Sequence, residues 1–362
     1  MRDCEIRPFE NCIRKVKYTN KIASQDFKPS GRFPIVSQEE AFISGYWDNP
    51  EDVFHIDGPV VIFGDHSRHI KYVDFDFVIG ADGVKILAPV EDIDTKYLYY
   101  YLKSQPIQSL GYSRHYKVLK EKYVPVLSLA EQQRIVVELD LLSRVIELKN
   151  AQIRTLDELA QSIFYEMFGD PVSNEKVWDT LKMKVVAPQK GYSGNIPMHN
   201  GKQWLLNLDM VESQTGQILE KVLLSPTEIG NSTTTFNEEN VLYSKLRPYL
   251  NKVVIPDEPG YCTSELVPLL PDKDKLNRVF LAYLLRSKFF VEYINARVAG
   301  AKMPRVSMSD FRDFDVILPH YTLQESFAGR MLSIENQKRI IKNSMLAAKD
   351  LLASRMDKYF NE

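Results

Sequence analysis

Four stretches of the chain carry lysine and arginine without any aspartate or glutamate, and they hold the residues best suited to chemistry. They span residues 66–73, 95–120, 240–256 and 293–309, and each interleaves its cations with tyrosine or histidine. Lysine and arginine neutralise phosphates with release of counterions, and arginine can bond bidentately to guanine. The stretches therefore predict DNA-binding loops. The competing interpretation is that these stretches are ordinary protein surface, because the chain has 46 basic residues and most basic residues face solvent.

We expect the DNA contacts to come from the cations and histidines of these stretches, with tyrosines adding polar or stacking contacts. Tyr192 is included although it lies outside them. The predicted set is Arg68, His69, Lys71, Arg114, His115, Tyr116, Lys117, Tyr192, Lys245, Arg247, Tyr249, Lys302 and Arg305.

Motifs for catalysis are missing from the sequence. It has no Walker P-loop, no GxGxxG fingerprint and no adenine-methyltransferase loop of the form [DNS]PP[YFW]. His66 and His69 beside Asp65 could ligate a metal, but the nearby cations favour phosphate or base contact instead. Residues 256–258 (PDE) fit a surface turn better than a nuclease site, because no ExK follows. We therefore expect neither a catalytic residue nor a metal site.

Composition excludes several classes of protein. Hydrophobic residues make up 44% and charged residues 26% of the 362 residues, which is typical of a globular chain. No apolar run reaches the roughly 18 residues that span a bilayer, and residues 1–8 lack the apolar core of a signal peptide. Cys4, Cys12 and Cys262 suggest neither disulfides nor zinc. We expect a cytoplasmic protein.

An internal repeat organises the chain. Residues 126–170 match residues 318–362 at a constant offset of 192, which places Gln132 on Gln324 and Phe168 on Phe360. Apolar residues in both segments recur in steps of four and three, the spacing of a coiled coil. The predicted seam is Ile135, Leu139, Leu142, Ile146, Ile153 and Leu156 in the first helix, and Phe327, Met331, Ile334, Ile341, Met345 and Leu352 in the second.

Charge favours pairing of these two helices with each other. Residues 126–170 hold four basic and eight acidic residues, whereas residues 314–362 hold seven basic and six acidic ones. Lys149, Lys338 and Arg355 fall on the seam, where a charge can fix register and partner. We expect an antiparallel coiled coil within the chain, the alternative being a coiled coil with another chain. Ser128 with Glu131 forms a capping box at the start of the first helix, and Gly169 ends it.

The segments between the helices also resemble each other. Each has runs rich in Val, Ile, Tyr and Phe, bounded by Gly, Asp and Pro, followed by a short helical pattern. The predicted class is α+β, with two repeated mixed α/β globules separated by two long helices in pseudo-two-fold relation. The predicted domains are 1–125, 126–170, 171–316 and 317–362.

In this order, the motifs resemble the specificity subunits of type I restriction-modification systems along nearly the whole chain. The matching strings are residues 129–136 (LAEQQRIV) with 166–171 (EMFGDP), 63–66 (FGDH) with 80–87 (GADGVKIL), and 240–248 (NVLYSKLRP). The resemblance implies a non-catalytic reader of double-stranded DNA. The globules 1–125 and 171–316 would be target recognition domains, each reading half of a split, asymmetric site, and the helical segments would be conserved regions.

The resemblance also implies partners. Two methyltransferase subunits would dock on the helices and bind S-adenosylmethionine, and restriction subunits would bring ATP and Mg. A helix of about 40 residues is roughly 60 Å long, more than one DNA turn of about 34–36 Å, so helix length should set the unread gap. The alternative is a scaffold or DNA mimic that binds the same subunits without reading DNA, but a mimic should be acidic where these loops are basic. An autonomous methyltransferase or nuclease would need the missing motifs.

Overall fold

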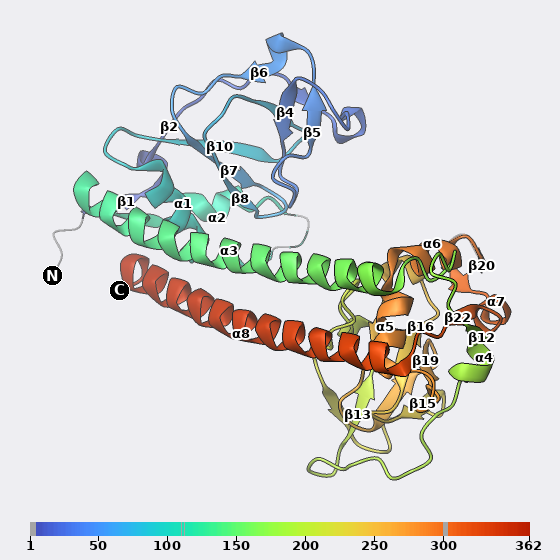
Figure 1. The fold of residues 1–362 in the computed structure, drawn as a ribbon. Helices are drawn as coiled ribbons and strands as arrows, with labels where there is room; N and C mark the ends of the chain where they lie inside the picture. The colour runs from blue at the N-terminus through green and yellow to red at the C-terminus, as the bar shows by residue number, and fades with distance from the viewer. Residues whose placement is uncertain (1–4, 110, 112, 300–302) are drawn as a thin grey trace. The chain divides into compact units, whose positions relative to one another are not determined.

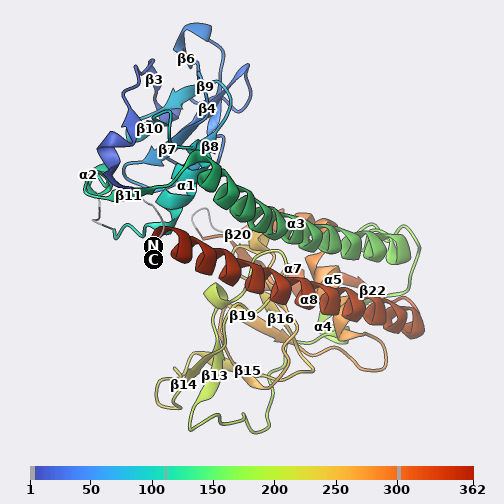
Figure 2. The ribbon, with the colours of Figure 1, turned by 90° about the vertical axis from the view of Figure 1, so that its left-hand side faces the viewer.

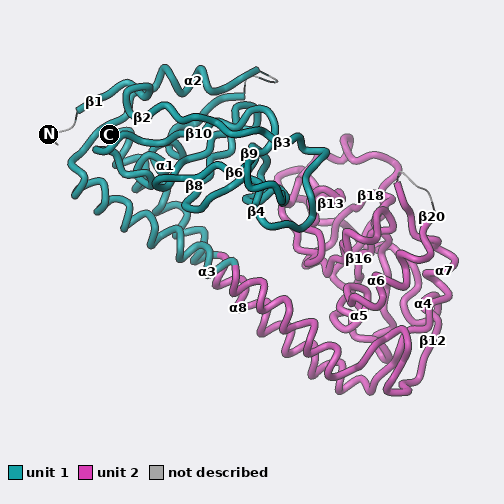
Figure 3. The backbone as a smooth tube through the Cα atoms, turned by 90° about the horizontal axis from the view of Figure 1, so that it is seen from above, with its two compact units in different colours: residues 1–150, 343–362 teal, residues 151–342 magenta. Residues whose placement is uncertain are grey.

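The computed structural model describes residues 5–109, 111, 113–299 and 303–362. The chain divides into two compact units, coloured in Figure 3: unit 1 is residues 1–150 with 343–362, and unit 2 is residues 151–342. The two longest helices, α3 (Leu129–Phe168) and α8 (Tyr321–Phe360), have 40 residues each. Each unit therefore contains one half of both helices. No helix among the described residues is long and apolar enough to cross a membrane.

Unit 1 combines two small sheets with a strand pair and two helices. The first sheet has the order β2-β10-β7-β8, namely Ile13–Arg14, Val84–Pro89, Val60–Gly64 and Ile70–Val73. The second has the order β3-β9-β4-β5, with β6 also on β9, namely Lys21–Ile22, Phe77–Gly80, Phe33–Val36, Gly45–Trp47 and Val53–Phe54. The remaining elements are β1 (Glu5–Pro8) paired with β11 (Tyr123–Val126), α1 (Thr95–Ser104), α2 (Tyr116–Lys120), and the 3₁₀ helices η1 (Phe9–Asn11), η2 (Ser24–Asp26) and η3 (Pro50–Asp52).

Unit 2 is built from similar parts. One sheet has the order β14-β13-β18-β15, namely Val222–Leu224, Gln203–Leu206, Gly260–Thr263 and Thr233–Phe236. A second has the order β17-β16-β19, namely Val253–Val254, Val241–Ser244 and Leu266–Leu269. Two strand pairs are β12 (Thr180–Lys182) with β22 (Asp315–Ile317) and β20 (Val298–Ala299) with β21 (Arg305–Val306). The helices are α4 (Met183–Val186), α5 (Arg278–Arg286), α6 (Lys288–Asn295), α7 (Met308–Arg312), η4 (Leu208–Met210) and η5 (Pro248–Leu250).

The repeat seen in the sequence continues into the sheets. In unit 1 the central strand β7 pairs antiparallel with β8 and β10, and α1 packs on all three. In unit 2 the central strand β16 pairs antiparallel with β17 and β19, and α5 packs on β16 and β17. The pair β1–β11 corresponds to β12–β22, both antiparallel. The predicted mixed α+β fold class is thus confirmed, and the repeat extends into the sheets.

A buried glutamine joins the start of each long helix to its domain. Gln132 of α3 donates from Nε2 to the carbonyls of Asp92 and Leu127, both at 2.8 Å, and accepts the N–H of Asp94 at 2.8 Å. Gln324 of α8 makes the same three bonds, to Lys275, Pro319 and Asn277. Asp94 and Asn277 are the N-caps of α1 and α5, so each glutamine fixes the short helix that covers the sheet.

A phenylalanine anchors the far end of each long helix. Phe360, near the end of α8, packs edge-on against Tyr97 of α1 with ring centroids 5.2 Å apart. Phe168, at the end of α3, packs edge-on against Phe280 of α5 at 4.7 Å. Tyr97 and Phe280 occupy the same position relative to their helix caps. Each domain therefore holds the start of one long helix and the end of the other.

The residues of the predicted seam lie along α3 and α8. Figures 1 and 2 show α3 and α8 running side by side. The seam residues are buried or half-buried, with full burial at Ile135, Leu139, Phe327, Met331 and Ile334 and partial burial at Leu142, Ile146, Ile153, Leu156, Ile341, Met345 and Leu352. The ion pairs Glu138–Arg355 and Asp157–Lys338 join the two helices within this chain, in line with the intrachain alternative. Ser128 Oγ accepts the N–H of Glu131 at 3.3 Å as the first half of the expected cap, and Gly169 ends α3 at φ +75°.

Cross-helix ion pairs link the antiparallel helices α3 and α8 in both units. In unit 1, Glu138 of α3 accepts Arg355 Nε at 3.0 Å. In unit 2, Lys338 Nζ of α8 lies 2.7 Å from Asp157 of α3 and 3.0 Å from Glu335. Burial lowers the pKa of Lys338, but the two carboxylates outweigh it and leave that pKa above its ordinary value. Two of the three predicted charged seam positions, Lys338 and Arg355, thus pair α8 with carboxylates of α3, and Lys149 takes no part in these pairs.

Replacing Asp157 with alanine should destabilise unit 2, because Lys338 is only 6% exposed and would lose its cross-helix partner. Breaking a buried pair costs about 3–5 kcal/mol, and the exposure of Asp157 reduces the expected loss to about 1–3 kcal/mol. Glu147→Ala is the matched control, because Glu147 pairs with Arg144 on the open surface of α3, and it should cost less than about 0.5 kcal/mol. Equal urea-unfolding free energies for the two variants would contradict the assignment.

Candidate nucleic-acid interface

In unit 1, the buried Asp65 joins two of the basic stretches. It follows β7 and is 1% exposed. Its carbonyl accepts the backbone N–H of His115 at 2.8 Å and lies 2.9 Å from ring Nδ1 of the same residue. Its Oδ1 accepts the N–H of Tyr116 at 2.7 Å. Because a carbonyl can only accept, Nδ1 of His115 carries the proton. The predicted residues near 68 and near 115 are therefore brought together by backbone and side-chain bonds.

Arg68 adds a second link between the same segments. Its Nη1 donates to the carbonyl of Ile107 at 3.0 Å, and its backbone N–H donates to Gly64 at 2.8 Å. Arg68 adopts a left-handed conformation with φ +67° and is exposed. Exposed His69, Arg114 and Lys117 belong to the same linked segments. These four side chains form the solvent-facing part of the predicted set in unit 1.

Lys71 and His115 lie in the interior, which corrects the expectation that both are presented on the surface. Lys71 is 5% exposed and donates to the carbonyls of Ser37 at 2.9 Å and Ala41 at 2.6 Å. Burial lowers the pKa of its ammonium group. His115 is fully buried against Asp65. Both side chains hold neighbouring loops in place, since a buried donor is costly unless bonded.

Tyr116 is half-buried and packs between aromatic rings and cations. Its ring centroid lies 6.4 Å from those of Phe9 and Phe63, and the ammonium groups of Lys85 and Lys120 lie 5.4 and 5.7 Å from it. Burial raises the pKa of its hydroxyl. Lys120 is itself paired with Glu10 at 2.7 Å. The ring of Tyr116 therefore packs beneath the loop and stabilises it.

In unit 2, the turn after β16 is joined to the strand β21. The carbonyl of Lys245 accepts the N–H of Val306 at 2.9 Å, and Arg247 donates its N–H to Pro304 at 2.8 Å. Lys245 also donates its N–H to Glu265 at 3.0 Å. Predicted residues from 245–249 and 303–309 thus lie next to each other, and we call the surface formed by the turn after β16 and by β21 the basic edge of unit 2. Lys302, predicted as a contact, lies outside the described residues.

The side chains at this edge differ in their exposure to solvent and in whether they form an ion pair. Arg247 and Tyr249 are exposed, and Lys245 is half-buried. Arg305 is exposed but pairs with Glu265 at 2.9 Å, so part of its charge is already neutralised. Tyr192 is elsewhere: it is half-buried, and its backbone bonds to Thr235 of β15. The structure gives no contact that brings Tyr192 to the basic loops of the described chain.

The sequence did not predict the organising role of two residues of unit 1, Gln38 and Asp65, and it pointed to Asp65 only beside a possible metal site. Gln38 accepts the N–H of His66 at its Oε1 at 3.1 Å, and its carbonyl accepts the hydroxyl of Ser67. A search for stretches without acidic residues passes over both, because Gln38 precedes Glu39 and Glu40 and Asp65 is acidic itself. The useful signal was the FGDH string, which places a carboxylate directly after a buried strand.

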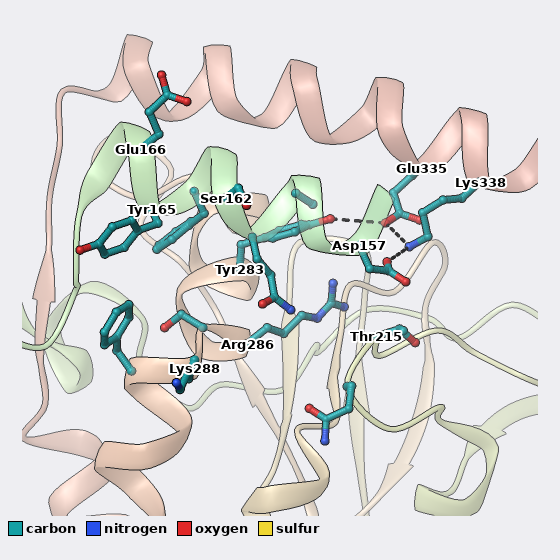
Figure 4. Close-up of a pocket in the computed structure, with 16 residues that line it drawn as sticks. Asp157, Ser162, Tyr165, Glu166, Thr215, Tyr283, Arg286, Lys288, Glu335 and Lys338 are labelled. Carbon is teal, nitrogen blue, oxygen red and sulfur yellow. Dashed lines mark hydrogen bonds and ion pairs between the residues drawn. The ribbon is translucent and has the colours of Figure 1, made fainter. Parts of the chain in front are cut away.

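A cavity of about 450 Å³ lies in unit 2, between α3, α5 and α8 (Figure 4). Lys338, Asp157 and Glu335 form its ion-paired wall, and the hydroxyl of Tyr283 donates to Glu335 at 3.3 Å. The guanidinium of Arg286 is held by the carbonyl of Val253, and burial lowers its pKa. None of its lining residues belongs to the predicted DNA contacts. In the part of the chain that the structure describes, no group of three or more His, Cys, Asp or Glu could hold a metal ion.

Comparison with known proteins finds type I restriction enzyme specificity subunits among the relatives of this chain. No family model matches the chain. It is 22% identical over 352 residues to the EcoR124I/EcoR124II type I restriction enzyme specificity subunit of Escherichia coli, covering 90% of this chain and 83% of that protein. It is 24% identical over 370 residues to the MjaVIII type I restriction enzyme specificity subunit of Methanocaldococcus jannaschii, covering 92% and 86%.

Solved structures show the same fold. The S subunit of a type I restriction-modification system from M. genitalium superposes with a TM-score of 0.60 at 14% identity, over 99% of this chain and 96% of that one. A chain from a structure of type I restriction-modification assembly and conformational transition superposes with a TM-score of 0.51 at 15% identity, over 97% and 96%. The predicted resemblance to specificity subunits is confirmed.

Removing the Asp65 carboxylate should loosen the linked loops of unit 1. Asp65→Ala leaves the amide of Tyr116 without its acceptor, which should cost about 1–3 kcal/mol of unfolding free energy and speed hydrogen exchange at that amide. Asp65→Asn keeps an acceptor oxygen and should exchange more slowly than the alanine variant. Asp57→Ala, which breaks an exposed pair with Arg14, controls for general charge loss. Wild-type exchange at Tyr116 in Asp65→Ala would refute this role.

Proposed function

We propose that this chain, whose curated relatives are type I restriction enzyme specificity subunits, is the non-catalytic DNA-recognition subunit of such a complex. One observation carries the proposal beyond the resemblance. In each unit, basic segments far apart in sequence are bonded together beside the turn that follows the central strand, β7 or β16. Two matching basic edges on two repeated domains suit a reader of double-stranded DNA.

Each unit would read one half of a split target. Unit 1 would use Arg68, His69, Arg114 and Lys117, and unit 2 would use Lys245, Arg247, Tyr249 and Arg305. These two sets differ in residue type and order, so the two half-sites should differ in sequence and the full target should be asymmetric. Sequence is read at base edges, whereas phosphate contacts mainly position the protein.

Helix length would set the unread gap between the half-sites. Both α3 and α8 continue for 40 residues, which at 1.5 Å per residue is roughly 60 Å. The antiparallel ion pairs keep the two helices in one register along this length. Helices of fixed length would give a gap of fixed length.

The exposed apolar face of α3 would receive a methyltransferase subunit. Val137, Leu141, Val145 and Leu148 are 40–64% exposed and recur in steps of four, four and three. They lie on one stripe of the helix, turned away from the seam residues Ile135 and Leu139. Large exposed apolar side chains grouped on one face mark interaction sites. In unit 2, α8 carries Leu332 and Ile340 exposed in the same way.

The partners would supply the chemistry. Two methyltransferase subunits would bind S-adenosylmethionine and modify adenine N6, and restriction subunits, where present, would bring ATP and Mg. The complex would work in the cytoplasm, where the DNA is. A scaffold or DNA mimic is the competing function, but a mimic presents carboxylates where these edges present exposed arginine and lysine.

Co-expression with a methyltransferase subunit encoded beside this chain tests the proposal. We expect single-molecule sequencing of the host genome to find methylated adenines in a new bipartite motif with a fixed gap. The same cells without this chain are the control and should lack the motif. A stable complex that methylates nothing would favour the scaffold instead.

Shortening both helices by one heptad tests the spacer. Deleting residues 147–153 and 341–347 together removes matched levels of the antiparallel pair. Seven residues contribute about 10 Å of helix, so the gap in the methylated motif should shorten, by up to about 3 base pairs at about 3.4 Å each. Both half-sites should keep their sequences. An unchanged gap in an active complex would show that the helices do not set it.

A further inference from the structure

Two arginines share an unusual backbone conformation. Among the described residues, Arg68 and Arg247 are the basic residues with positive φ, at +67° and +50°. The left-handed region costs an L-residue roughly 1–2 kcal/mol, and glycine or asparagine occupies it more cheaply. Unit 2 itself uses asparagine in this conformation at Asn251. Keeping arginine at such a position suggests that its side chain is needed there.

The two arginines occupy matching places in the repeated sheet. Arg68 follows the end of β7 by four residues, and Arg247 follows the end of β16 by three. Their backbone N–H groups are both bonded at 2.8 Å, to Gly64 and to Pro304. The left-handed turn and these bonds fix the direction in which each side chain leaves the main chain.

Neither guanidinium is paired with a carboxylate among the residues that the structure describes. Arg68 donates from Nη1 to the carbonyl of Ile107, and both side chains are exposed. Other arginines differ: Arg14 pairs with Asp57 and Arg305 with Glu265. Arg68 and Arg247 can therefore bind an acceptor on a ligand without first breaking an ion pair.

We infer that Arg68 and Arg247 are the matched specificity-determining residues of the two domains, each reading a guanine in its own half-site. The inference rests on the proposed function. Guanine presents O6 and N7 side by side in the major groove, and the fork of a guanidinium matches them with two parallel N–H donors. A phosphate accepts bonds from many directions and would not require a fixed, strained backbone. The rigid left-handed turn suits a base edge.

Arginine-to-glycine variants separate recognition from stability. Glycine relieves the left-handed strain, so the melting temperature of Arg247→Gly should equal or exceed that of the wild type. That of Arg68→Gly should stay close to the wild-type value, because relief of strain offsets loss of the Nη1 bond to Ile107. In the methylation assay, each variant should lose preference for guanine at one position of one half-site by about five- to 150-fold, equivalent to about 1–3 kcal/mol. The other half-site should be unchanged, and the two variants should affect different halves.

Lysine variants and two control variants complete the test. Arg68→Lys and Arg247→Lys keep the charge but not the fork, so they should bind DNA better than the glycine variants while still accepting other bases at that position. Lys117→Ala should lower methylation of all sites alike without changing the motif, as expected of a phosphate contact. Arg14→Ala, which removes a paired surface arginine, should leave the motif and its methylation unchanged.

Each outcome decides between specific alternatives. A wild-type chain that directs a bipartite motif upholds the proposed function whatever the variants do. If Arg68→Gly or Arg247→Gly then lowers methylation uniformly, that arginine is a phosphate contact and the inference is wrong for it. Unchanged motif and unchanged methylation overturn it as well. A wild-type chain without any motif overturns both the proposed function and this inference.

Discussion

The burial of the apolar stripes on α3 and α8 is the constraint on which both units depend. A single helix of 40 residues cannot cover its own stripe, so each half must pack against the other helix and against a domain. Each domain supplies that surface twice, once to the start of one helix and once to the end of the other. Gln132 and Phe360 mark these two contacts in unit 1, and Gln324 and Phe168 mark them in unit 2.

The same contacts position the basic edges. Each buried glutamine bonds to the N-cap of the short helix that packs on the central strand, and the basic turn follows that strand. The two units then stabilise the turn in different ways. Unit 1 uses a buried carboxylate, Asp65, to gather its segments. Unit 2 uses backbone bonds between 245–247 and 304–306. A shared frame with different turn chemistry would allow the two domains to read different sequences, as the proposed function requires.

The helical part of the fold could be predicted from sequence because its determinants are local. The offset of 192 and the heptad spacing predicted the two helices, and two of the three charged seam positions, Lys338 and Arg355, pair across them. Strand order was not predictable, because pairing such as β2 with β10 joins residues about 75 apart. The expected exposure of Lys71 and His115 was wrong for a related reason. Both are polar residues typical of a surface, and the groups that bury and bond them, Ser37, Ala41 and Asp65, lie far away in the sequence.

Ion pairing within the chain decides how much each predicted cation can contribute to DNA binding. Every phosphate contact that displaces a counterion adds about one unit to the salt dependence of binding. Arg305 must first break its ion pair with Glu265, and Lys120 its ion pair with Glu10. Their net contribution to the free energy of DNA binding is therefore small. Arg247 has no such cost among the described residues. An almost neutral chain, with net charge −2, would therefore bind DNA through a few unpaired cations placed at two edges, a mode that favours discrimination between sequences over general affinity.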